Sequence, residues 1–196
     1  MSLVDTATKT ELTALYQAPN RHYHDIRHIE ALLGLLGAHR QAFADPEAVE
    51  AAIWFHDAIY DSRRKDNEIA SAAFAADRLR GHVDAPRLAR IAKMIEATAT
   101  HQVPEFEDGT VRQDAALFLD MDLSILGAPT EVFDAYEAAV RREYDWVNDA
   151  DWRAGRAAVL KSFLARPRIF HTDIFAERFE AQARENMAGS LAKLSG

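Results

Sequence analysis

The chain has 196 residues, of which 48% are hydrophobic and 28% charged, a composition typical of a globular protein and not of a disordered one. Its formal net charge of −8 argues against broad binding to nucleic-acid backbones, because such binding requires clustered Lys and Arg. Cysteine is absent, which excludes disulfides, thiolate nucleophiles and cysteine-based zinc sites, so any metal must be bound by nitrogen and oxygen ligands.

The start of the chain, MSLVDTATKTELTALYQAPN, lacks the basic and apolar regions of a secretory signal. No stretch approaches the roughly 20 apolar residues that a membrane span requires. We therefore expect a cytoplasmic protein that has neither a membrane nor a nucleic-acid polymer as partner. At this length, one compact domain over residues 1–196 is the default expectation.

Apolar residues recur at helical spacing nearly throughout, so we predict an all-α, single-domain helical bundle. Phe133, Tyr136 and Val140 follow one another at steps of three or four, and Phe175 and Phe179 begin a second such stripe. With one long loop at 101–111, the predicted helices cover residues 6–17, 24–40, 46–60, 67–80, 85–100, 112–126, 130–147, 151–165 and 173–193.

The first of three clusters of histidines and acids is the segment Tyr23-His24-Asp25-Ile26-Arg27-His28. His24 and His28 are four residues apart, so within the predicted helix they share one face. A single histidine on an amphipathic helix is more often a structural residue than a ligand. This cluster alone is therefore weak evidence for a site.

The second cluster runs from Trp54 to Asp61 and contains His56 and Asp57. Its apolar residues are expected to carry His56 and Asp57 into the interior, where an ionised Asp needs a partner. A divalent cation is one suitable partner, and hydrogen bonds to the backbone at a helix end are the alternative. Asp61, one predicted turn beyond Asp57, is expected to hold a water or orient a ligand, unless it is a solvated acid.

The third cluster holds Asp120 and Asp122 within an otherwise apolar predicted helix. Only one of the two needs to face a site, since residues two apart on a helix point to different sides. One exposed and one salt-bridged acid is the alternative. His101 follows Thr98 at a predicted helix end, and it is either a ligand for a second metal or phosphate or an exposed loop histidine.

The order of these residues resembles the H…HD…D signature of the HD superfamily, with His28 first, then His56-Asp57, then a late Asp. The chain is similar over nearly its whole length to the bacterial family described as predicted HD-superfamily metal-dependent phosphohydrolases. A single His-Asp dipeptide is common by chance, whereas four motifs in the right order are specific. These motifs are RxYHxxxHI at 21–29, FHDxxYD at 55–61, NExxSA at 67–72 and DxDLxILG at 120–127.

The resemblance implies an HD-type helical domain in which His28, His56, Asp57 and the late Asp bind a divalent metal. In related enzymes the last acid sits in an Ala-Asp-Arg-Leu-like context, which favours Asp122 over Asp120. Two imidazoles and two carboxylates suit Mn, Fe, Zn, Co or Ni, as one or two ions, better than Ca or Mg.

Residues 23–28 are also similar to the YHNxxH segment of cyclic-nucleotide phosphodiesterases, although Asp25 stands where that pattern has Asn. By this similarity His24 is the general acid, which protonates the leaving alkoxide. The metal is expected to provide a hydroxide that attacks phosphorus. Asp61 is a second candidate catalytic residue, and Asp120 joins His101 as a candidate for a second metal or phosphate.

Three basic residues near the motifs are candidates for neutralising a substrate phosphate, although surface solvation is the commoner fate of such residues. They are Arg27, Arg64 and Lys65.

The sequence thus predicts a metal-dependent phosphomonoesterase or phosphodiesterase acting on a small phosphorylated molecule, such as a nucleotide. One alternative is an HD-fold di-iron oxygenase with His101 and Asp61 as extra ligands. Another is a non-enzymatic helical binding module that has kept a structural metal. A third treats residues 24–28 as a variant of the HExxH zinc-peptidase helix, but it leaves His56 and Asp57 unexplained.

Overall fold

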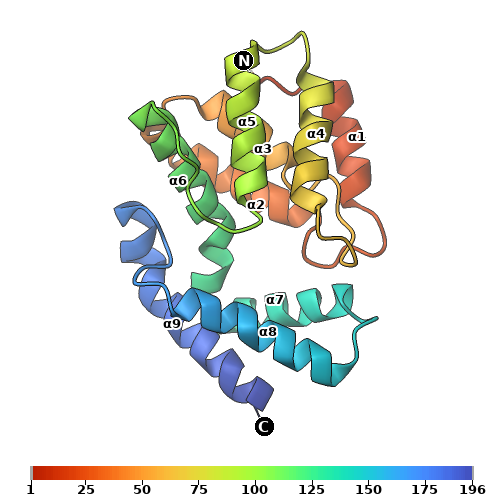
Figure 1. Cartoon of the computed structure of the whole chain (residues 1–196), viewed down its shortest axis with the longest axis vertical. Helices are drawn as coiled ribbons and strands as arrows, with labels where there is room; N and C mark the ends of the chain where they lie inside the picture. Colours follow the sequence, from red (N-terminus) through yellow and green to blue (C-terminus); the bar gives the residue numbers. More distant parts are fainter. Residues whose placement is uncertain (1, 196) are drawn as a thin grey trace. The chain divides into compact units, whose positions relative to one another are not determined.

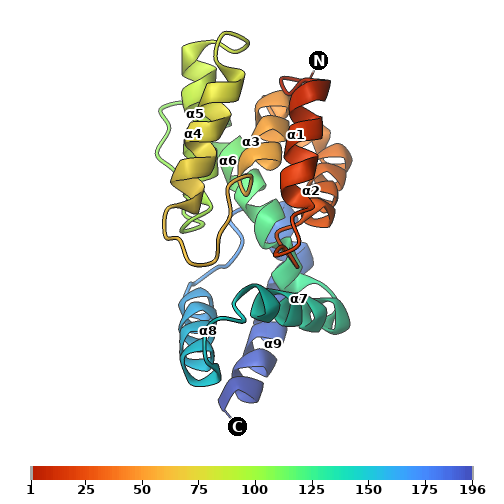
Figure 2. The same cartoon turned by 90° about the vertical axis from the view of Figure 1, so that its right-hand side faces the viewer.

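The computed structural model describes residues 2–195, and its regular structure is helical (Figures 1 and 2). Within these residues there is no strand, only an isolated bridge between Arg80 and Val83. The all-α prediction is therefore confirmed. No helix in the described part combines the length and the apolar character that crossing a membrane requires.

All nine predicted helices are present in the described residues, joined by two short 3₁₀ helices. The elements in chain order are α1 (Thr6–Tyr16), α2 (Ile26–Ala38), η1 (Arg40–Ala42), α3 (Pro46–Phe55), α4 (Asn67–Leu79), α5 (Ala85–Ala97), α6 (Gly109–Leu123), η2 (Ser124–Gly127), α7 (Thr130–Glu143), α8 (Asp149–Leu164) and α9 (Asp173–Ser195).

The chain divides into two compact units, the first ending at Asp122 and the second beginning at Leu123. The prediction of one HD-type domain over 1–196 stays a prediction, and its first and last residues lie outside the described range.

Helix α3 is the central element of the first unit, since it packs against α1, α2, α4 and α5. Its Val49, Ile53 and Phe55 are fully buried, as expected for a helix surrounded on all sides. Helices α4 and α5 lie side by side in both views (Figures 1 and 2). Helix α6 joins this packing through Asp114, whose carboxylate accepts the N–H groups of residues 44 and 45 at 2.9 and 2.8 Å.

In the second unit, α9 packs against η2, α7 and α8. The predicted stripes supply its core: Phe133 and Phe175 are fully buried. A partly buried ion pair between Arg156 and Glu137 connects α8 to α7, and Ser190 of α9 donates to Glu137 at 2.8 Å. These contacts hold three helices together through one carboxylate.

Several helix boundaries differ from the prediction, and two of the differences affect the candidate site. Helix α2 begins at Ile26 instead of residue 24, and α3 ends at Phe55 instead of residue 60. At the start of α2 the side chain of Asp25 accepts a main-chain N–H, and after α3 side chains of α4 bond the main chain. These bonds replace those that a longer helix would provide. Helix α6 starts at Gly109, earlier than predicted, because Asp108 accepts the N–H of Thr110 at 2.8 Å.

Gly127 provides a test of the packing in the second unit. A Cβ added there would lie 2.6 Å from both the Cβ and the carbonyl oxygen of Phe179, so we expect Gly127→Ala to lower the free energy of unfolding by about 1–3 kcal/mol. In the interior of α8, an added Cβ at Gly155 meets no atom within 4 Å, so Gly155→Ala should raise stability by about 0.5–1 kcal/mol. Urea unfolding followed by circular dichroism measures both, and equal effects of the two variants would contradict the packing described.

Candidate metal centre

Asp25 determines where α2 begins. Its side chain accepts the N–H of Arg27 at 2.9 Å, so it caps the helix and Ile26 is the first helical residue. His28 therefore lies in the first turn of α2, where it is buried. His24 precedes the cap and lies outside the helix. The prediction that His24 and His28 share a helix face is thus wrong, because the extended backbone of the capping residue separates them.

His56 is the C-cap of α3, and its own N–H still bonds the carbonyl of Ala52. Its ring Nδ1 lies 2.9 Å from the carbonyl oxygen of Ile53. A carbonyl can only accept, so Nδ1 carries the hydrogen, and Nε2 is the nitrogen that can offer a lone pair. The local structure thus selects the tautomer that a metal ligand requires.

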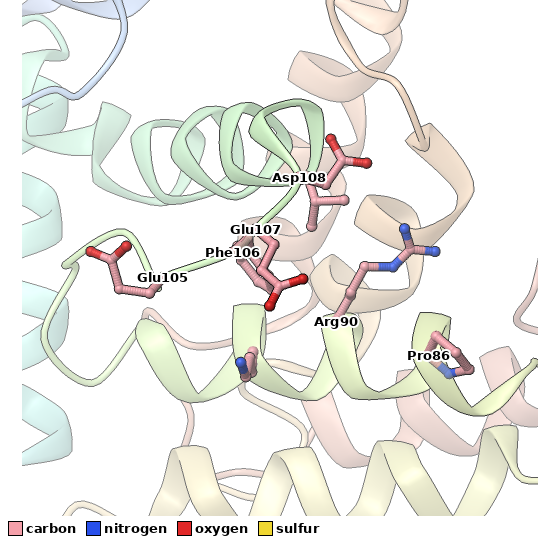
Figure 3. Close-up of a pocket in the computed structure, with 8 residues that line it drawn as sticks. Pro86, Arg90, Glu105, Phe106, Glu107 and Asp108 are labelled. Carbon is pink, nitrogen blue, oxygen red and sulfur yellow. The ribbon is translucent and has the colours of Figure 1, made fainter.

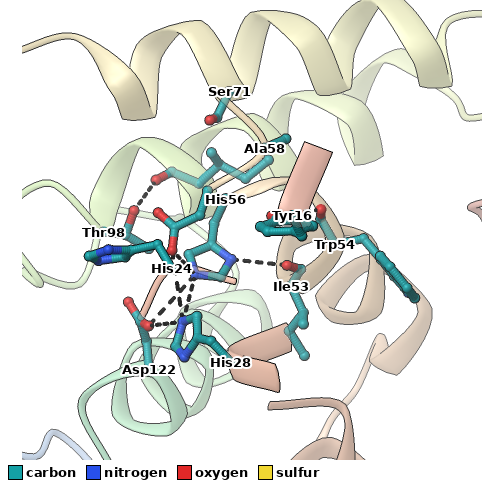
Figure 4. Close-up of polar contacts among 12 residues, drawn as sticks. Tyr16, His24, His28, Ile53, Trp54, His56, Ala58, Ser71, Thr98 and Asp122 are labelled. Carbon is teal, nitrogen blue, oxygen red and sulfur yellow. Dashed lines mark hydrogen bonds and ion pairs between the residues drawn. The ribbon is translucent and has the colours of Figure 1, made fainter. Parts of the chain in front are cut away.

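The donor atoms of His28, His56 and Asp122 converge on one point (Figure 4), and the carboxylate of Asp57 lies beside the two imidazoles; we name these four residues the His–Asp centre. The two Nε2 atoms of His28 and His56 are 3.2 Å apart. Oδ1 of Asp122 lies 3.1 Å from Nε2 of His28 and 3.7 Å from Nε2 of His56. Oδ2 of Asp57 lies 3.1 Å from Nε2 of His56 and 3.8 Å from Nε2 of His28.

The three shortest of these spacings, 3.1, 3.1 and 3.2 Å, fit the geometry of a coordinated transition metal. Ligands bonded at about 2.1 Å and separated by 90–110° lie about 3.0–3.4 Å from one another. The donor atoms of His28, His56 and Asp122 all lie within 4.8 Å of each other, and Asp57 is a fourth candidate donor. The two imidazoles are 5% and 1% exposed and the two carboxylates 15% and 12%, so the centre is open mainly on its acidic side.

Charge is concentrated in the centre. Burial alone would lower the pKa of His56, but the nearby carboxylates, Asp57 first, overcome it and raise that pKa to about 9. Burial would likewise raise the pKa of both Asp57 and Asp122, but the surrounding imidazoles hold each below its usual value. A divalent cation bound at Nε2 of His56 would replace the proton that the carboxylates hold there.

The structure distinguishes the two late acids. Asp122 reaches the imidazoles, as preferred from the sequence. Asp120 is fully buried but does not belong to the group of converging donor atoms, since two residues along α6 turn its side chain away from that of Asp122.

His101 contacts the second oxygen of Asp122, with 2.9 Å between Nε2 and Oδ2. It follows α5 and adopts a left-handed backbone with φ of 51°, while its N–H bonds the carbonyl of Ala97. A histidine in this conformation is uncommon. Asp122 therefore has imidazoles near both of its oxygens.

The segment 57–61 leaves the helix, and side chains of α4 bond its main chain. Ser71 accepts the N–H of Ile59 at 3.0 Å and donates to the carbonyl of the same residue at 3.2 Å. Asn67 repeats this pattern with the N–H and carbonyl of Asp61, at 3.1 and 3.0 Å. The helix expected to carry Asp61 one turn beyond Asp57 is thus absent. Asp61 is exposed, and its carboxylate accepts the N–H of Arg63.

The supporting roles of Asn67 and Ser71 were missed from the sequence, although both lie in a motif quoted for the resemblance. Their spacing of four residues, which puts two polar side chains on one face of α4, is the signal that was available. Arg21 was missed in the same way: it donates to the carbonyls of Asp57 and Ala58.

The three candidate phosphate-binding residues lie on the surface. Arg27 donates from Nε and Nη2 to Oδ2 of Asp25, and Arg64 donates from the same two nitrogens to the two carboxylate oxygens of Asp66. Lys65 is exposed. The structure thus places both guanidinium groups on neighbouring carboxylates, and the predicted contact with phosphate stays a prediction.

A cavity of about 700 Å³ lies between α5 and the segment before α6 (Figure 3). Arg90 and Lys93 line it together with Phe106, and Glu105, Glu107 and Asp108 add acidic groups. No residue predicted as a site residue lines this cavity. The cavity therefore shares no lining residue with the His–Asp centre.

Comparison with known proteins returns no matching family model, no matching curated protein and no matching solved structure. The interpretation of the centre therefore depends on its own geometry.

The bonds from Ser71 to Ile59 can be tested by Ser71→Ala. The variant leaves a part-buried N–H and carbonyl without this partner, so we expect a loss of about 1–3 kcal/mol in the free energy of unfolding. Ser162→Ala is the matched control, because Ser162 is exposed and bonds only a carbonyl of its own helix. Chemical denaturation compares the two, and a loss at Ser71 no larger than at Ser162 would show that the bonds do not stabilise the turn.

Proposed function

We propose that this protein is a metal-dependent hydrolase of small phosphate esters, of the HD type, with its metal bound by the His–Asp centre. The observation that carries the proposal is the convergence of His28, His56 and Asp122, which are far apart in the sequence, on a single point. Their order along the chain, with Asp57 directly after His56, is the H…HD…D order of the resembling family.

The donor set supports this function. Two neutral imidazoles and two carboxylates favour Mn, Fe, Co, Ni or Zn, and four protein ligands leave coordination positions open on an octahedral ion. A bound cation of this kind polarises a phosphoryl oxygen and acidifies a water molecule. The partly exposed carboxylates of Asp57 and Asp122 mark the side from which the ester enters.

His24 is the proposed general acid. Its ring is stacked on that of Tyr60 with 4.3 Å between the ring centres, and it lies 6.4 Å from the ring of His28. The imidazole therefore lies close to the centre without belonging to the converging donors. From there it can donate a proton to the leaving oxygen of the ester.

Metal binding is the first test. Adding Mn²⁺, Co²⁺, Ni²⁺ or Zn²⁺ to chelator-treated protein at about 100 times Kd should stabilise the fold by about 2.7 kcal/mol and raise Tm by about 5–10 °C. Elemental analysis should give one or two ions per chain.

His56→Ala should abolish the rise in Tm, because it removes the most deeply buried donor. His82→Ala is the matched control, since His82 is exposed and lies outside the donor group. An equal rise in Tm in both variants, or no rise with any of these four metals or with Fe²⁺ under anaerobic conditions, would refute the metal centre.

The second test is catalysis. A screen of nucleotides and sugar phosphates should find an ester that the metal-loaded protein hydrolyses and the His56→Ala, Asp57→Ala double variant does not. His24→Ala should lower kcat by about 10²–10⁴-fold while metal content is unchanged. Equal losses of metal and turnover would make His24 a ligand instead.

One observation favours a second candidate function, a di-iron oxygenase. Asp122 has His28 near Oδ1 and His101 near Oδ2, an arrangement in which one carboxylate could bridge two ions. Two irons per chain with oxygen uptake, and no phosphate release, would support this candidate. A protein that binds metal but shows neither reaction would be the non-enzymatic module.

A further inference from the structure

Arg21 is a buried cation beside the His–Asp centre. It lies in the loop between α1 and α2, and it is 8% exposed. Its guanidinium donates three hydrogen bonds to main-chain carbonyls. Nη1 donates to His24 at 2.9 Å and to Asp57 at 2.7 Å, and Nη2 donates to Ala58 at 2.8 Å.

These bonds connect two segments that are far apart in the sequence. One segment carries His24, and the other is the turn that carries the candidate ligand Asp57. Because a single nitrogen donates to both carbonyls, the separation of the two segments is limited to what that nitrogen can reach.

Aromatic rings add a second connection between Arg21 and His24. The guanidinium lies 4.9 Å from the ring centre of Tyr16 and 5.5 Å from that of Tyr60. Tyr60 in turn stacks on His24. Tyr16 is itself fixed, since its hydroxyl donates to the carbonyl of Trp54 at 3.0 Å. Arg21 therefore contacts the carbonyl of His24 directly, and it contacts the imidazole of His24 indirectly through the ring of Tyr60.

We propose that Arg21 is a positioning residue, which sets the distance between the imidazole of His24 and the metal ligands. This inference rests on the proposed function, in which His24 is the general acid. A displacement of about 1 Å in a reacting group can lower a rate by about 10²-fold, so the effect of losing Arg21 appears in turnover. It does not appear in metal content, because Arg21 donates to the carbonyl of Asp57 and not to its carboxylate.

Lysine cannot perform this role. Its ammonium keeps the charge, but it lacks the planar fork that reaches three carbonyls and that packs flat against rings. Arg21→Lys is therefore the informative variant, since it preserves charge and approximate volume while removing the geometry. Arg78→Lys is the matched control, because Arg78 also lies over a ring, that of Phe74, and forks onto a carboxylate on the surface.

Three measurements test the proposal on the full-length, metal-loaded protein. For Arg21→Lys we expect kcat to fall by about 10–100-fold with KM within about threefold of wild type. We expect the metal content to stay that of wild type. In ¹⁵N-histidine-labelled protein, the ring signals of His24 should shift, because the ring leaves the face of Tyr60. Arg78→Lys should change none of these quantities.

Chemical rescue separates positioning from a general loss of fold. Millimolar methylguanidine should restore turnover to Arg21→Ala, and the same concentration of urea should not. Rescue by neither compound, or Arg21→Lys with wild-type turnover and unshifted His24 signals, would overturn the proposal. Loss of metal from Arg21→Lys would also overturn it, by making Arg21 part of the support for the ligands.

The NMR measurement keeps this inference distinct from the proposed function. If wild-type protein hydrolyses no ester, the proposed function fails, while the His24 signals of Arg21→Lys still report whether Arg21 positions that ring. Unshifted signals in an active wild-type background would defeat the positioning role alone.

Discussion

The main chain of residues 57–61 is the constraint on which the centre depends. These residues follow a buried helix end without continuing it, so their peptide groups need partners from elsewhere. Ser71 and Asn67 bond both groups of Ile59 and Asp61, while Arg21 takes the two preceding carbonyls. Because side chains of α4 hold this turn, Asp57 is kept near the imidazoles that it must meet, and Arg21 connects the same turn to the segment that carries His24.

The imidazoles and carboxylates of the His–Asp centre also shift one another's pKa values. The carboxylates stabilise a proton on His56, whose pKa rises to about 9, and the imidazoles lower the pKa of the carboxylates. Proton and cation thus compete for one lone pair on Nε2. The bond from Nδ1 to Ile53 is compatible with either occupant. The ring can therefore keep its orientation when the proton is exchanged for a metal.

Much of this arrangement could be predicted from periodicity and charge. Apolar stripes gave the nine helices, and the cost of burying acids pointed to Asp57 and to one of the late pair. Helix ends were harder, because they depend on contacts made across the fold. The spacing of Asn67 and Ser71 puts both on one face of α4, but it does not identify the peptide groups of residues 59 and 61 as their partners. Similarly, His24 appeared to lie on α2 because its spacing from His28 is helical, whereas the cap at Asp25 ends that pattern.

The left-handed backbone at His101 sets the stability of the main chain against the side-chain contact with Asp122. Glycine adopts such a conformation without steric cost, so replacement by glycine would relax the main chain there. It would also delete the imidazole that meets Asp122. A more stable main chain and an intact contact with Asp122 therefore require different residues at this position. The imidazole at this backbone angle thus gives up main-chain stability for its contact with Asp122.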